Sequence, residues 1–72
     1  MSHAPDSTVQ IAGMIRIARK RAKLSQEEAA TAAEIARSTW QRIEDGAEEV
    51  GLATVVRAAA VVGLKIVAEV AQ

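Results

Sequence analysis

Residues 25–46 read SQEEAATAAEIARSTWQRIEDG and carry the clearest indication of the fold. Ser25 and Glu28 stand three positions apart, which is the spacing of a capping box. In a capping box each of the two side chains accepts a hydrogen bond from the other residue's backbone N–H at the start of a helix. We therefore predict a helix from residue 26 to about residue 33.

A second short helix is predicted from residue 37 to about residue 45. Gly46 follows it, and glycine readily takes the left-handed conformation in which many helices end. Residues 34–36 then form a tight turn between the two helices, with Ile35 as its buried anchor. The stretch therefore predicts a helix-turn-helix.

The sequence before this stretch predicts a disordered tail over residues 1–6 and then an amphipathic helix over residues 9–22. Ser7 and Gln10 resemble a second capping box. Apolar residues recur at three- and four-residue steps, as expected for one face of a helix. These residues are Ile11, Ile15, Ala18 and Ala22, with Met14 beside them.

The sequence after this stretch is more apolar. Residues 52–62 are apolar on almost every side, which predicts a helix that is buried all round, partly by something outside the chain. Residues 64–70 are β-branched and partly alternating, which favours a terminal strand over an extension of the helix. A single strand leaves its edges unpaired, so it would pair with a second copy. We assign residues 7–63 to the helix-turn-helix domain and residues 64–72 to a dimerisation segment.

The composition predicts one small all-α domain. The chain has 72 residues, of which 50% are hydrophobic, but Trp40 is its only aromatic residue. A core of small side chains in so short a chain is marginal, and dimerisation is one remedy. There is no cysteine, so no disulfide or thiolate metal site is expected, and we expect no cofactor. We also expect a cytoplasmic protein, because neither a membrane span nor a signal segment is recognisable.

The formal net charge is zero, but the charges are separated along the chain. Cations gather before and within the helix-turn-helix, and acids gather after it. A neutral chain with one basic face still attracts phosphate locally. The alternative is a pair of ordinary solvated helix surfaces. The cations are Arg16, Arg19, Lys20, Arg21, Lys23, Arg37 and Arg42, and the acids are Glu44, Asp45, Glu48 and Glu49.

Residues 11–62 resemble the phage-repressor/Cro-type helix-turn-helix domain, also called the xenobiotic-response-element family. The resemblance rests on the basic end of the first helix, RKRAKL over residues 19–24, and on SQEE over residues 25–28. It also rests on Ala30, where the two motif helices cross, and on RSTWQRIEDG over residues 37–46. The resemblance implies a compact repressor-like fold of four to five helices that binds double-stranded DNA.

The resemblance also implies which residues face the DNA. The second motif helix of such domains enters the major groove, where arginine pairs well with guanine and glutamine with adenine. The residues that match base-reading positions are Arg37, Ser38, Gln41 and Arg42. The residues assigned to phosphates are Gln26, Thr39, Arg16 and Lys20. The alternatives are that Gln26 is simply solvated and that Arg42 and Glu44 form ordinary surface ion pairs, which are worth little energetically.

The chain departs from the family pattern at four positions. Glu34 stands where a glycine is frequent, and a left-handed residue with a side chain costs about 1 kcal/mol there. Ala29 is smaller and Trp40 is larger than usual, so we predict that the Trp40 ring lies in the core and fills the volume beside Ala29. Ala36 lacks the oxygen that commonly caps the second motif helix.

We therefore expect a homodimeric, sequence-specific repressor on a palindromic operator, with recognition helices ~34 Å apart. An antitoxin that autoregulates its operon and binds a toxin protein is an alternative, and a pure protein-interaction module is a third. We expect no enzyme, because a cap fully explains Ser25 beside Glu28. The residues predicted to form the dimer are Val55, Val62, Leu64, Ile66, Ala68 and Val70.

Overall fold

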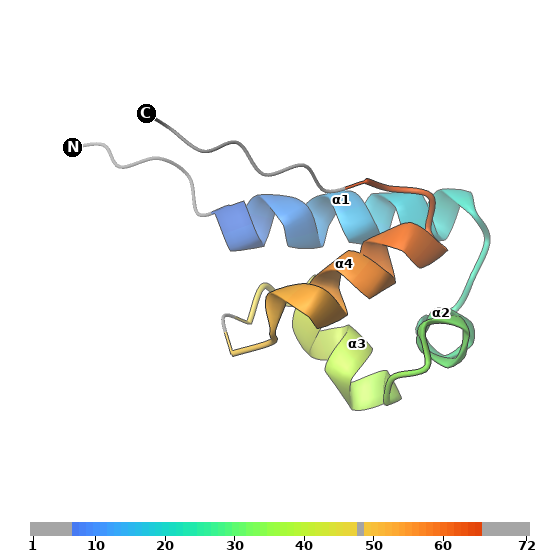
Figure 1. Cartoon of the computed structure of the whole chain (residues 1–72). Coiled ribbons are helices and arrows are strands. Elements are labelled where there is room, and N and C mark those ends of the chain that lie inside the picture. Colours follow the sequence, from blue (N-terminus) through green and yellow to red (C-terminus); the bar gives the residue numbers. More distant parts are fainter. Residues whose placement is uncertain (1–6, 48, 66–72) are drawn as a thin grey trace.

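Four helices follow one another along the part of the chain that the structure describes (Figure 1). The computed structural model describes residues 7–47 and 49–65, and of residues 7–9 it describes the backbone alone. Within these ranges every regular element is a helix, which confirms the all-α fold. The predictions for residues 1–6 and for a strand over residues 64–70 lie outside the described residues, except for residues 64 and 65. The helices are α1 (Ser7–Arg21), α2 (Gln26–Ala33), α3 (Arg37–Glu44) and α4 (Leu52–Val61).

The capping box at the start of α2 is confirmed. The Ser25 hydroxyl accepts a hydrogen bond from the Glu28 N–H at 3.0 Å, and the Glu28 carboxylate accepts one from the Ser25 N–H at 2.8 Å. These bonds to Ser25 hold the pKa of Glu28 below its usual value. The N-terminus of α2 is therefore fixed by the local chemistry that the sequence predicts.

All four helices end in the same backbone motif. Just beyond each helix lies a residue with a positive φ. The backbone N–H of the residue that follows it bonds to a carbonyl five residues earlier, which is the Schellman arrangement. The left-handed residues are Lys23, Glu34, Gly46 and Gly63, with φ of 62°, 61°, 78° and 81°. Three of the four motifs turn the chain back toward the core, where Leu24, Ile35 and Leu64 pack.

The core is built from small side chains around one large ring. Trp40 and Ile15 are both 0% exposed, and alanines occupy many of the positions around them. Trp40 lies in the same buried cluster as Ala29, which confirms its place in the core. α2 packs against α3 and α4, and α1 packs against α3. The buried cluster comprises Ile15, Ala29, Ala30, Ala33, Trp40, Ile43, Ala58, Ala59 and Val62.

The chain itself covers the fourth helix only in part, and its predicted cover by something outside the chain stays a prediction. α4 buries Ala58 and Ala59, but Leu52 is 67% and Val56 is 41% exposed. The reason is size, because a chain of this length lacks the residues to surround a central helix. None of the helices in the described part is long and apolar enough to cross a membrane.

Candidate nucleic-acid interface

The outward side of α3 carries the four residues predicted to read bases. Arg37, Ser38, Gln41 and Arg42 are all exposed, whereas Trp40 and Ile43 point into the core. Positions i, i+1, i+4 and i+5 share one face of a helix, so the four polar side chains form a single surface.

A polar hollow lies beside this surface and joins three helices. It has a volume of about 220 Å³ and is lined by Arg16, Arg19, Gln26, Gln41, Glu44 and Asp45. The structure thus brings together three predicted DNA-binding residues: Arg16 from α1, Gln26 from α2 and Gln41 from α3. Of the four residues predicted to bind phosphates, the other two are Lys20, which is exposed on α1, and Thr39, which is partly buried on α3. Neither of them lines the hollow.

The buried carboxylate of Glu44 lines the hollow. The Glu44 side chain is only 3% exposed. Arg19 donates to it from Nε at 2.5 Å and from Nη2 at 3.1 Å. The Trp40 indole N–H donates at 2.6 Å, and the Gln26 amide donates at 3.0 Å. Arg19 also donates from Nη1 to the Leu24 carbonyl at 2.9 Å. One carboxylate therefore joins α1, α2 and α3 at the point where residues predicted to face DNA meet.

The electrostatics of Glu44 result from two opposing effects. Burial raises the pKa of Glu44, but hydrogen bonds from Arg19, Trp40 and Gln26, together with the Arg19 charge, outweigh burial and hold this pKa below its usual value. Glu44 is therefore ionised at neutral pH and keeps its four hydrogen bonds.

Comparison with known families agrees with this geometry. Residues 10–72 match the family model of the helix-turn-helix domain. The chain belongs to this family. The match confirms the helix-turn-helix interpretation and makes α2 and α3 the two helices of a DNA-binding motif. No protein of curated function matches the sequence.

The prediction that Arg19 belongs to the basic surface of the first helix is wrong. Its side chain is only 10% exposed and binds Glu44. The spacing indicates the buried position of Arg19, because Ile11, Ile15 and Arg19 are four residues apart and share a helix face. An arginine is expected to be exposed to solvent, and the buried partner of Arg19, Glu44, lies 25 positions away in the sequence.

The alternative of an ordinary surface ion pair is confirmed for Arg42 and is wrong for Glu44, whose carboxylate is buried against Arg19. Arg42 forms an ion pair with Glu49 at 2.9 Å, and their side chains are 59% and 60% exposed. Such a surface pair contributes little energy, so a DNA phosphate or base can replace Glu49 as the partner of Arg42.

The residues predicted to form a dimer fall into three groups. Val62 belongs to the core of the domain and is 9% exposed, so little of it is available to a second subunit. Val55 and Leu64 are partly buried against the core and keep some exposed surface. The other three, Ile66, Ala68 and Val70, lie outside the described residues.

Proposed function

We propose that this helix-turn-helix domain is a sequence-specific transcriptional regulator that represses genes by binding double-stranded DNA as a homodimer. The observation that carries the proposal is the continuous polar surface of α3 beside the hollow that also contains Arg16 and Gln26. A helix with a polar exposed side and an opposite side that is packed into the core suits insertion into the major groove.

The proposed roles follow from donor and acceptor chemistry. Arg37 and Gln41 present paired hydrogen-bonding groups to base edges, and Ser38 and Arg42 add contacts beside them. Gln26 donates one amide hydrogen to Glu44, and the second amide hydrogen remains for a phosphate. Arg16, Lys20 and Thr39 supply further contacts to the DNA backbone, which position the domain without reading sequence.

The homodimer follows from the limited reach of one recognition helix. A single α3 contacts few base pairs, whereas two copies related by a two-fold axis read both halves of a palindrome. Exposed apolar residues on α4, namely Leu52 and Val56, support burial against a second subunit. A dimer seated on an operator excludes other proteins from that DNA, which favours repression.

The first test is selection of bound duplexes from random DNA, followed by affinity measurements across a salt series. Arg37→Ala should lose about 1–3 kcal/mol at one base position and relax the preference there. Arg16→Ala should weaken binding to all sequences and reduce the salt slope by about one. Lys65→Ala is the control, because Lys65 is an exposed cation beyond α4. Equal effects from the two arginine variants would contradict the assigned roles, and no enriched sequence would contradict the function.

The exposed apolar side of α4 also supports the alternative of an antitoxin, whose partner is a toxin protein. Sedimentation of the purified chain separates the two functions. A dimer in the absence of other proteins supports the regulator. A monomer that assembles only with the product of an adjacent toxin-type reading frame, and whose co-expression relieves growth arrest by that product, supports the antitoxin.

A further inference from the structure

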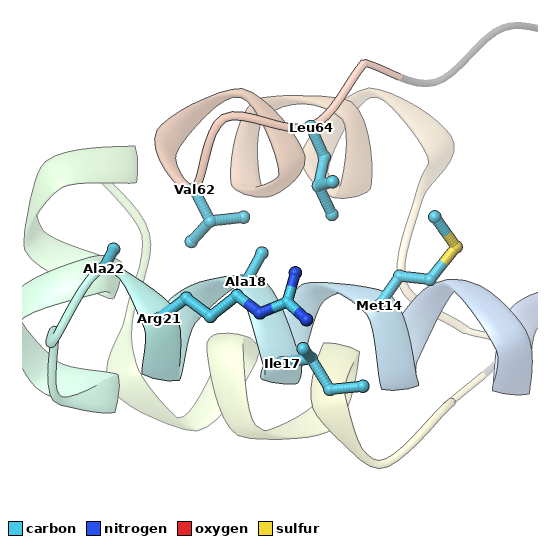
Figure 2. A pocket seen from close by; sticks show the side chains of 7 residues that line it. All are labelled: Met14, Ile17, Ala18, Arg21, Ala22, Val62 and Leu64. Atoms are coloured by element: carbon cyan, nitrogen blue, oxygen red, sulfur yellow. The ribbon is translucent and has the colours of Figure 1, made fainter.

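An apolar groove runs between α1 and the chain that leaves α4 (Figure 2). Its volume is about 570 Å³. Met14 and Ile17 on its α1 wall are 56% and 55% exposed, which is unusual for large apolar residues in a domain whose core consists mostly of alanine. The residues that line the groove are Met14, Ile17, Ala18, Arg21, Ala22, Val62 and Leu64.

The groove is separate from the DNA-facing surface. Arg16 is two residues from Met14, which places it roughly 200° around the helix axis. A partner in the groove therefore leaves Arg16 and the polar hollow uncovered, and the groove needs an explanation other than DNA.

We propose that the chain's own C-terminal segment, residues 66–72, lies in this groove and covers Met14 and Ile17. The described chain reaches Lys65 directly after Leu64, which itself lines the groove (Figure 2). The segment therefore begins at the groove wall. Seven extended residues span up to about 23 Å, whereas Met14 and Arg21 are separated by about 11 Å along α1.

The composition of the segment matches the lining. Its sequence is IVAEVAQ, in which five of the seven residues are apolar and Glu69 is the one charged residue. In an extended chain Ile66, Ala68 and Val70 share one face, and that face suits Met14 and Ile17. Arg21 is the one cation among the lining residues and is available to Glu69. The family match continues to residue 72, so the segment belongs to the domain itself.

This inference goes beyond DNA binding and does not depend on it. Docking within one chain completes the apolar core, and the backbone edge of the docked segment stays available for a second copy. A second copy in the groove, or another protein, would be a different occupant, and the tests below separate these cases.

The first test uses disulfide formation in the full chain, which contains no native cysteine. Met14→Cys is combined in turn with Ile66→Cys, Ala68→Cys and Val70→Cys, and mild oxidation is followed by mass spectrometry and non-reducing gels. Lys20→Cys with the same partners is the control, because Lys20 is exposed on another side of α1. We expect at least one Met14 pair to form an intramolecular disulfide at least tenfold faster than its control. Intermolecular disulfides, or rates equal to the control, would overturn the proposal.

The second test measures whether Ile17 is covered. Ile17→Ser should lower the melting temperature of the full chain by roughly 10 °C, as expected for loss of a packed side chain. Lys20→Ser is the control, because Lys20 is exposed on another side of the same helix, and a shift of about 3 °C or less is expected there. Equal shifts in the two variants would show that Ile17 remains in water, contrary to the proposal.

Discussion

The outward and inward sides of α3 differ in almost every physical property, although the helix has only eight residues. The outward side is exposed and carries donors without fixed buried partners, as the proposed DNA recognition requires. The inward side combines Trp40 and Ile43 with the buried carboxylate of Glu44. The position of the outward side is therefore set from beneath, by the buried charge of Glu44.

Glu44 connects three helices in addition to occupying space in the core. Its carboxylate is bound by Arg19 from α1 and by Gln26 from α2, so the three helices meet at one group. Apolar packing tolerates small shifts, but hydrogen bonds to a carboxylate lose energy steeply with distance and angle. The network therefore fixes the angle at which α3 presents its outward side.

The largest expected effect comes from Glu44→Ala. This substitution leaves the Arg19 guanidinium buried without its carboxylate, and breaking a buried pair costs about 3–5 kcal/mol. Urea unfolding of the variant measures this loss. Glu49→Ala is the control, because it breaks an exposed pair and should change the unfolding free energy by less than about 1 kcal/mol. Equal losses in the two variants would mean that Glu44 is no more important than a surface acid.

Acidification should weaken the same network by a smaller amount, because a protonated Glu44 keeps some of its hydrogen bonds. The pKa of Glu44 is lowered in the folded chain, so its contribution to stability is fully present above the unfolded value of about 4.3. The contribution is lost as the pH falls from there through the lower folded pKa. We expect the urea midpoint to decrease below pH 4.5.

The variant Glu44→Gln shows how much of this pH dependence belongs to Glu44. Its urea midpoint should be lower than that of the native chain at pH 7 and should change less between pH 5 and pH 3. A pH dependence as steep as that of the native chain would assign the loss to other carboxylates, including that of Glu28.

A structural feature of this chain can be predicted from the sequence when the interaction that fixes it is between residues close together in the sequence. The ends of α2 and the left-handed turn at Glu34 follow from residues within one helical turn, and the sequence predicts them. The buried position of Arg19 depends on Glu44, 25 residues away, and is not visible locally. The outward side of α3 is predicted because residues four apart share a helix face. The exposure of Leu52 is not predicted in this way, because it depends on how much of α4 the rest of the chain covers.

A moderate effect, on binding alone, is expected from Gln41→Ala on the outward side. The side chain is exposed, so the unfolding free energy should change by no more than about 0.5 kcal/mol. Affinity for the selected operator should decrease by about 1–3 kcal/mol, mostly at one base pair. Fluorescence anisotropy with single-base operator variants measures this effect. A uniform loss across all variants would assign Gln41 to the phosphate backbone.

The smallest expected effect is a gain in stability, from Ala36→Ser at the start of α3. Ala36 has φ −69° and ψ 148°, the extended conformation of a capping residue, but it makes no side-chain cap hydrogen bond. A serine hydroxyl there should accept a bond from a first-turn N–H and stabilise the fold by about 0.5–1 kcal/mol. Ser25→Ala, at the start of α2, should cost a similar amount and is the matched reverse change. Both variants are followed by urea unfolding. Since Ala36→Ser changes how firmly α3 begins and leaves the outward side chains unchanged, the base preference of the domain should stay the same. A changed preference would show that the reading surface is set at the first turn of α3 as well as by Glu44 at its end.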